Sequence, residues 1–202
     1  MSIGRPEIVD RLREATRDLH AEVEEVAAVT QGGLERYLWF VGRQYGFAAP
    51  LEPLIAAAPA IAETGLDVEQ RRRAHLFAAD LLHFGIHPGN LPRCVALPRV
   101  GSASRALGAL YVLEGSTLGG AFLLNHLSRT LGITPTAGGS GLAPYGHSLR
   151  EMWVAYADAV DGWVRGEPGA SFEVVDAAKE TFVRMIHWMR APAGLSLTVA
   201  QA

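Results

Sequence analysis

A histidine near the start of the chain has neighbours that would suit it to bind a metal. In the segment LREATRDLHAEVE, His20 is followed four residues later by Glu24 and preceded by Arg17 and Arg13, at three and seven positions. Residues at these spacings share one face of a helix, so the four side chains would lie together. A carboxylate that accepts the proton of one imidazole nitrogen leaves the other nitrogen free for a metal and raises its basicity.

The two arginines indicate which kind of metal complex such a histidine could bind. Cations beside a neutral nitrogen ligand suit a metal whose own surrounding ligand carries carboxylates, and haem with its two propionates is such a complex. The same spacing also describes an ordinary surface helix with a His–Glu contact and solvated arginines. Spacing alone favours this ordinary interpretation, so the haem hypothesis needs a second feature.

The second feature is the glycine content of the most apolar stretch, LYVLEGSTLGGAFL. Gly108, Gly115 and Gly119, seven and four residues apart, would lie on one face of a helix, and the pair Gly119–Gly120 could kink it. Each glycine inside a helix costs about 1 kcal/mol relative to alanine, so the missing side chains need a reason. Close packing against another helix and a planar ligand lying on exposed backbone explain them equally well. Taken together with His20, the planar ligand gains support.

Composition indicates a globular protein and excludes several functions. Of the 202 residues, 49% are hydrophobic and 19% charged, which is enough to build a well-filled core. With a formal net charge of −3, nothing favours binding to nucleic acid or to an anionic membrane. Cys94 is the only cysteine, which rules out an intramolecular disulfide and a cysteine-based zinc site. Without an apolar signal region or an uninterrupted apolar span, the sequence predicts a cytoplasmic location and no membrane span.

Other catalytic motifs are missing or incomplete. His83 and His87 have the spacing of helical metal ligands, but Gly85 and Pro88 interrupt the helix that they would need. No Glu-x-x-His occurs, which argues against a di-iron carboxylate bundle. The chain also has neither a Gly-x-Ser-x-Gly elbow nor a Walker-type phosphate loop.

Helical periodicity runs along the chain, and no segment alternates in the manner of a strand. We predict a single all-α domain over residues 1–202 with about six main helices. Pro50 and Pro53 should bend or end the second helix. Asp67 with Gln70 and Ser148 with Glu151 are typical capping pairs at helix starts. The expected helices are Ile8–Val26, Leu34–Ala57, Asp67–Phe84, Ser102–Leu131, Ser148–Val164 and Phe172–Met189.

These segments resemble the heme oxygenase family, over most of the chain and in the same order. LREATRDLHAEVE resembles the proximal helix of heme oxygenases, and LYVLEGSTLGG resembles their glycine-rich distal helix. PYGHSLREMWVAY and DAAKETFVRMI resemble the last two conserved helices of the family. The likeness is greatest to bacterial members that accompany bacteriophytochromes. It implies a multi-helical all-α bundle with haem between the proximal and the distal helix.

The resemblance also implies roles for individual residues. His20 would be the axial iron ligand, and Glu24 would orient its ring. Arg13, Arg17 and Arg150 match positions that meet the haem propionates. Gly115, Gly119 and Gly120 would form the distal wall, where side chains would occupy the space of haem and dioxygen. The catalytic residues implied are Gly115, Ser116 and Gly119. The haem-binding residues implied are Arg13, Arg17, His20, Glu24, Tyr111, Gly115, Gly119, Gly120, Arg150 and Phe182.

One position departs from the animal members of the family. They carry an aspartate directly after the first distal glycine, which anchors a water network that delivers protons, whereas this chain has Ser116. Bacterial members of the subgroup also lack the acid. The position leaves the path of proton delivery open, and it motivates an alternative function, a non-catalytic haem carrier or sensor on the same fold. A helical bundle that binds another small molecule is the second alternative.

The activity implied by the resemblance is that of a heme oxygenase. Haem would be both substrate and prosthetic group, and the products would be biliverdin, carbon monoxide and ferrous iron. The reaction would require dioxygen and electrons from an external reductase or ferredoxin. A bacteriophytochrome is a candidate acceptor of the biliverdin, while iron acquisition is the other purpose that the sequence leaves open.

Overall fold

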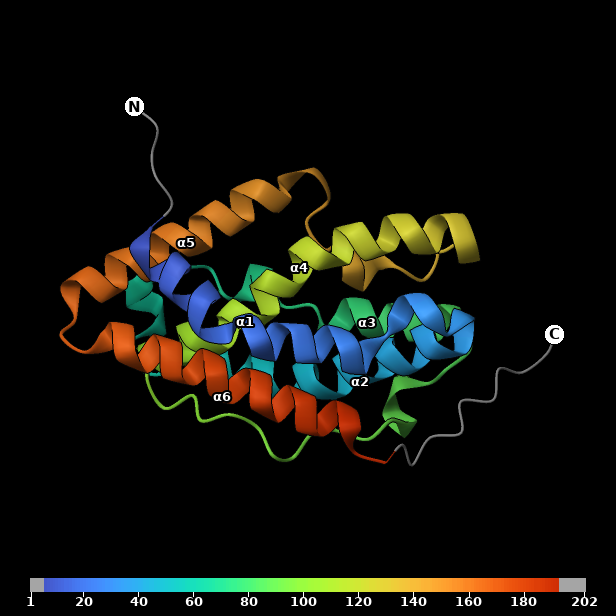
Figure 1. Ribbon diagram of the computed structural model, residues 1–202, viewed down its shortest axis with the longest axis horizontal. Coiled ribbons are helices and arrows are strands. Elements are labelled where there is room, and N and C mark those ends of the chain that lie inside the picture. Colours follow the sequence, from blue (N-terminus) through green and yellow to red (C-terminus); the bar gives the residue numbers. More distant parts are fainter. Residues whose placement is uncertain (1–5, 193–202) are drawn as a thin grey trace.

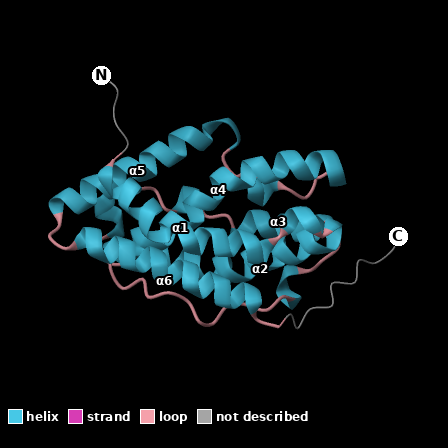
Figure 2. Cartoon of the chain, in the orientation of Figure 1, coloured by secondary structure: helices cyan, strands magenta, loops and turns pink. Residues whose placement is uncertain are grey.

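The computed structural model describes residues 6–192, which form six α-helices joined by loops and short 3₁₀ turns (Figures 1 and 2). Over this range the only extended pairings are isolated bridges at Thr134, so the all-α prediction is confirmed. The helices are α1 (Glu7–Ala27), α2 (Gly33–Ala56), α3 (Ala74–His83), α4 (Ala103–Leu131), α5 (Leu149–Gly166) and α6 (Ala170–Arg190).

Helix α4 forms the centre of the protein. Its first half is mostly buried, and it packs against α6, α2 and α5. By length and composition alone α4 could cross a membrane. The apolar side chains of its first half are buried inside the protein, however, so α4 is a core helix. It continues without a break through the glycine pair Gly119–Gly120.

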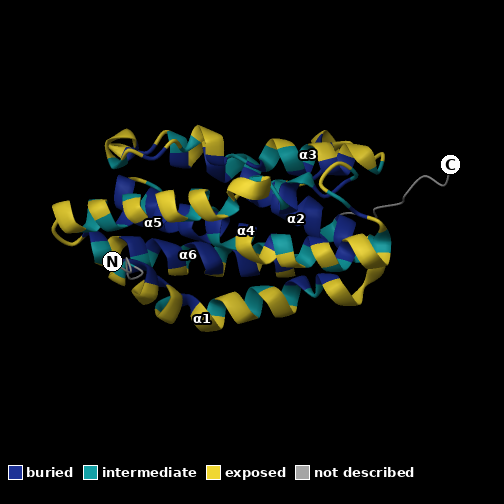
Figure 3. Ribbon diagram, turned by 90° about the horizontal axis from the view of Figure 1, so that it is seen from above, coloured by how far each residue is buried: buried dark blue, intermediate teal, exposed yellow. Residues whose placement is uncertain are grey.

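Helix α1 lies along α6 at the edge of the molecule. Its residues Ile8, Val9 and Leu12 are buried, and Leu19, Val23 and Val26, which continue the helical spacing from Ile8 and Leu12, are partly buried against the core. Figure 3 shows the exposed residues along the outer side of this helix. After α1 the chain makes a 3₁₀ turn, η1 (Val29–Gln31), which packs against α2 and α4.

Helix α2 continues through both of its prolines to Ala56, so neither Pro50 nor Pro53 ends it. A proline at position 50 removes the backbone N–H that would bond to the carbonyl of Gly46. In the structure the backbone N–H of Cys94 donates to that carbonyl instead, at 2.9 Å. The acceptor is therefore satisfied by a distant loop, and the helix tolerates the proline.

The predicted helix from Asp67 to Phe84 is wrong in its first part. Asp67 accepts hydrogen bonds from two backbone N–H groups, but these belong to a short 3₁₀ turn, η3 (Glu69–Arg71). Helix α3 begins only at Ala74, where the carboxylate of Glu52 in α2 accepts from the N–H groups of Arg73 at 2.8 Å and Ala74 at 3.1 Å. A carboxylate from another helix thus caps α3, which is favourable at a positive helix end.

The predicted capping box before α5 is also absent. Ser148 precedes the helix as expected, but its side chain makes no capping hydrogen bond. The 3₁₀ turn η6 (Gly146–Ser148) leads directly into α5, so the backbone of Ser148 does not take the extended form of an N-cap residue.

Candidate haem site

His20 and Glu24 lie one turn apart in the second half of α1. The imidazole Nδ1 is 3.5 Å from a carboxylate oxygen of Glu24, and the two side chains are 54% and 69% exposed. Because Nδ1 faces the carboxylate, Nε2 is the nitrogen left for a metal. The ring of Phe182 from α6 meets the imidazole edge-on with centroids 6.0 Å apart, which brings two predicted site residues together.

Tyr111 joins α4 to α1 close to this histidine. Its phenol lies near the Thr16 hydroxyl and near the charge of Arg13. Burial raises the pKa of Tyr111, while the Thr16 hydroxyl and the Arg13 guanidinium oppose that rise. The ring also packs beside Trp153 and Tyr156 of α5, so three helices meet at this residue.

One turn beyond this contact, both helices carry residues that were predicted to hold haem. His20 follows Thr16 by four positions and Gly115 follows Tyr111 by four, and such positions share a helix face. Figure 1 shows α1 and α4 running in the same general direction, so His20 and Gly115 lie on the same side of this contact. The turn η1, which follows α1, also packs against α4, so the segment of α1 that carries His20 lies between two contacts with α4. We call the region between His20 and Gly115 the α1–α4 opening.

The glycines of α4 serve two different purposes. β-carbons added to Gly115 and Gly119 would meet no atom within 4 Å, so the backbone there faces open space. A β-carbon on Gly108 would lie 2.3 Å from the carbonyl oxygen of Val174 in α6, and one on Gly120 would lie 2.6 Å from that of Leu142. Close packing explains the latter two, whereas nothing packs against the former two.

The three arginines assigned to the propionates are all exposed. Arg13 and Arg17 lie on α1, where Arg17 makes only a loose contact of 3.7 Å with the adjacent Asp18. Arg150 lies in the first turn of α5, the helix whose aromatic residues pack on Tyr111. Their guanidinium groups are therefore accessible to an anionic ligand.

Sequence reasoning missed a buried charged network beside α4. The guanidinium of Arg73 donates to the Ser116 hydroxyl at 2.7 Å and to the carbonyl of Leu113 at 2.8 Å. The Ser116 hydroxyl donates to the same carbonyl at 2.7 Å. Burial lowers the pKa of Arg73, and the charges of Glu114 and Glu52 oppose this change. The serine at the position of the missing aspartate is thus held by a buried cation.

A second arginine completes the network. Arg71 and Glu114 form a buried ion pair of 2.6 Å, and the Tyr145 hydroxyl donates to the other oxygen of Glu114 at 2.6 Å. Burial raises the pKa of Glu114, while Arg71 and Tyr145 oppose the rise. Two features of the sequence could have indicated this network: the run QRRRAHL and the one carboxylate within the apolar stretch of α4. Charged residues are rarely buried without partners, so a buried glutamate predicts a cation nearby.

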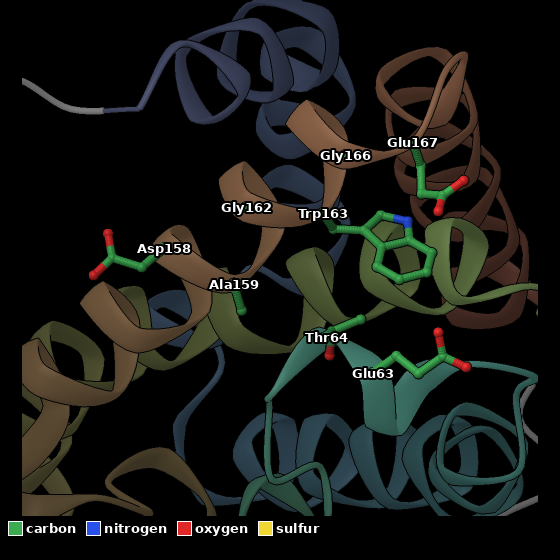
Figure 4. Close-up of a pocket in the computed structure, with 8 residues that line it drawn as sticks. All are labelled: Glu63, Thr64, Asp158, Ala159, Gly162, Trp163, Gly166 and Glu167. Atoms are coloured by element: carbon green, nitrogen blue, oxygen red, sulfur yellow. The ribbon is translucent and has the colours of Figure 1, made fainter.

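A cavity beside α5 is not a haem site. It has a volume of about 350 Å³ and lies between α5 and the 3₁₀ turn η2 (Ile61–Thr64), as Figure 4 shows. Glu63, Asp158 and Glu167 line it together with Trp163, and no histidine is among its lining residues. Three carboxylates would repel the two propionates of haem.

The protein offers no metal site of its own among residues 6–192, where no three His, Cys, Asp or Glu side chains are grouped to hold an ion. Haem iron differs because the macrocycle supplies four ligands and the protein needs to add only an axial one. An exposed histidine with a free Nε2 meets that need.

Comparison with known proteins identifies the family and the fold of this chain. The profile of the heme oxygenase family matches residues 7–191. Among solved structures, the chain is similar to the heme oxygenase of Neisseria meningitidis, known in crystal structures with NO and CO bound, with a TM-score of 0.76 and 22% identity. That alignment covers 95% of this chain and 98% of the other. No curated protein matches the sequence. Because the family profile spans nearly the whole chain and the fold agrees with it, this chain belongs to the heme oxygenase family.

Proposed function

We propose that this protein is an enzyme that degrades haem oxidatively to biliverdin, carbon monoxide and ferrous iron. One observation carries the proposal: His20 on α1 and the bare backbone of Gly115 on α4 lie one turn beyond the Thr16–Tyr111 contact that joins the two helices. A nitrogen ligand on one side and side-chain-free backbone on the other are what a planar iron complex requires.

The residues of the α1–α4 opening fit haem. Gly115 and Gly119 leave a space that a β-carbon could enter without contact, and His20 offers a neutral nitrogen. Arg13 and Arg17 provide cations for the propionates on the same face of α1. When bound, haem supplies the iron that activates dioxygen and the ring that is oxidised.

Each residue has a distinct task in this proposal. Glu24 fixes the tautomer of His20 by holding the proton on Nδ1, so that Nε2 is directed to the iron. The backbone at Gly115 and Gly119 closes the distal side while leaving room for a diatomic ligand. Phe182 packs against the imidazole ring and restricts its orientation.

Ser116 would take over part of the task of the missing aspartate. Its oxygen accepts from Arg73 and its proton goes to the carbonyl of Leu113. A hydroxyl oxygen has two acceptor positions, so one remains for a water molecule. We propose that Ser116, polarised by the buried guanidinium, orients a water that delivers protons on the distal side.

We further propose a cytoplasmic enzyme that receives electrons from a reductase or ferredoxin and passes biliverdin to a bacteriophytochrome. The absence of paired cysteines in the sequence and the likeness of its motifs to those of phytochrome-associated members support this setting. Loss of biliverdin-loaded phytochrome after deletion of the gene would support the acceptor. Undisturbed phytochrome loading combined with poor growth on haem iron would favour iron acquisition instead.

The experiment that tests the activity is titration of the purified protein with hemin, followed by reductant and dioxygen. We expect a Soret band that saturates at one haem per chain and then decays as biliverdin forms. A stable band that survives reductant and dioxygen would replace the enzyme with a haem carrier. Failure to form any Soret complex would remove both functions.

A further inference from the structure

The glycine-rich loop after α4 is wedged between α3 and α4. Its central part is a 3₁₀ turn, η5 (Ser140–Leu142), which packs against both helices. A β-carbon on Gly141 would lie 2.2 Å from the ring of Phe77 in α3, and one on Gly139 would lie 2.7 Å from Leu124 in α4. The loop therefore approaches both helices more closely than any residue with a side chain could.

A single buried carboxylate on α3 holds this loop. One oxygen of Asp80 accepts from the backbone N–H and from the hydroxyl of Ser140, both at 2.8 Å. Its other oxygen accepts from the N–H of Gly141 at 2.8 Å. Asp80 is only 3% exposed, so these bonds take the place of its hydration.

The loop reaches α4 at the turn that carries the open glycines. The backbone of Leu142 packs on Gly120, while the preceding residue, Gly119, faces open space. Successive helix residues point about 100° apart, so the loop contacts α4 to one side of the face that lines the α1–α4 opening, on the same turn. Arg73 contacts α4 at Ser116, one turn earlier.

We infer that Asp80 is a positioning residue for the distal wall. By holding Ser140 and Gly141, it keeps the backbone of Leu142 against Gly120 and so sets how closely Gly115 and Gly119 can approach a bound ligand. The carboxylate itself does not reach the opening, and it acts through the loop and α4. The effect on turnover rests on the proposed function, but the effect on α4 does not.

The test is hydrogen exchange of the backbone amides of residues 115–121 in protein without hemin. Asp80→Asn replaces one acceptor oxygen by a donor, which leaves the N–H of Gly141 without a partner. We expect exchange of these amides to accelerate by about tenfold, because the loop no longer holds the turn. The control is Asp176→Asn. It breaks an ion pair of 3.0 Å between α6 and Arg105 near the start of α4, and it should leave the exchange rates of residues 115–121 unchanged.

A second variant separates positioning from general destabilisation. Gly120→Ala forces a methyl group against the carbonyl of Leu142, and the loop can yield more readily when Asp80 no longer holds Ser140 and Gly141. The acceleration caused by Gly120→Ala should therefore be several-fold smaller in the Asp80→Asn background than in the parent. If Asp80→Asn does not fold, Ser140→Ala, which removes one of the three bonds, should give a two- to threefold acceleration at the same amides.

With hemin, Asp80→Asn should retain a Soret band but alter the mixture of biliverdin isomers or the biliverdin formed per dioxygen consumed. Unchanged exchange at residues 115–121 in a folded Asp80→Asn protein would overturn the inference. So would full additivity of the two substitutions. If the parent protein does not degrade hemin, the proposed function fails, while the exchange result still decides whether Asp80 positions α4.

Discussion

The guanidinium of Arg73 donates a hydrogen bond of 2.7 Å to the hydroxyl of Ser116. Ser116 lies on α4 and directly follows Gly115, whose backbone faces open space. Both groups also bond to the carbonyl of Leu113, so the serine oxygen has a defined position. A buried cation at this point would lower the pKa of an acidic side chain, and it would also polarise a hydroxyl group. The first prediction follows from this contact.

Ser116→Ala should bind hemin normally and form biliverdin more slowly, with more of the dioxygen released as hydrogen peroxide. The variant should lose only about 1 kcal/mol of unfolding free energy, because Arg73 keeps its bond to the carbonyl of Leu113. Ser116→Asp should retain turnover, since Arg73 can pair with the carboxylate. Equal peroxide release by parent and Ser116→Ala would show that the hydroxyl has no part in proton delivery.

His20→Ala should abolish turnover and give a ferric spectrum without an axial imidazole. Glu24→Ala should have a smaller effect, because it removes the orienting carboxylate while Nε2 can still bind iron. Resonance Raman measurement of the iron–histidine stretch would show a weaker bond in Glu24→Ala. His187→Ala, an exposed histidine of α6, is the control and should leave the spectrum intact. An unaltered spectrum in His20→Ala would place the iron ligand elsewhere.

The exposed arginines should set the orientation of haem more than its affinity. Exposed ion pairs contribute at most about 1 kcal/mol each, whereas burial of the macrocycle dominates binding. Replacement of Arg13, Arg17 and Arg150 by glutamine should therefore change the ratio of biliverdin isomers, measured by chromatography, with a modest loss of affinity. An untouched isomer ratio in the triple variant would mean that other groups hold the propionates.

Alanine at two glycines of the same helix should have opposite effects on stability. Gly119→Ala adds a methyl group in open space, so it should raise the unfolding free energy by up to about 1 kcal/mol while haem degradation falls. Gly108→Ala forces a methyl group into the contact with Val174 and should cost about 1–3 kcal/mol. Urea denaturation and biliverdin yield measure both. A stable Gly119→Ala protein with full turnover would remove Gly119 from the distal wall.

Glu52 should make the stability depend on pH. Burial raises its pKa above the ordinary value of 4.5, and the N–H groups of Arg73 and Ala74 oppose the rise. A carboxyl group with a raised pKa contributes stability that is fully present below its unfolded pKa and is lost as the pH rises through its folded pKa. The unfolding free energy of the parent minus that of Glu52→Gln should therefore fall as the pH rises from 4.5 through the raised pKa of the folded state. A difference that grows with pH would show that the hydrogen bonds outweigh burial.

Local spacing was enough to predict six helices and which side chains are neighbours on one of them, although the start of α3 and the capping box before α5 were predicted wrongly. His20 and Glu24 are neighbours because they lie one helical turn apart, and the buried stripe of α1 follows from the same periodicity. The likeness to heme oxygenases rested on such local motifs, and the family is confirmed by the match over residues 7–191. Gly115, Gly119 and Gly120 were all predicted to form the distal wall, because spacing alone could not distinguish a glycine that faces open space from one that packs against another segment.

Only the tertiary structure distinguished Gly115 and Gly119, which face open space, from Gly108 and Gly120, which pack against backbone of α6 and of the loop. It also showed that α3 begins where the carboxylate of Glu52 caps it, and that Arg73 contacts Ser116, which lies 43 positions further along the chain. Hydrophobic periodicity reports which side of a helix is buried, but it carries no information on which distant segment covers that side. Those partners are chosen by the packing of whole helices, and here that packing also decides which parts of α4 remain open for a ligand.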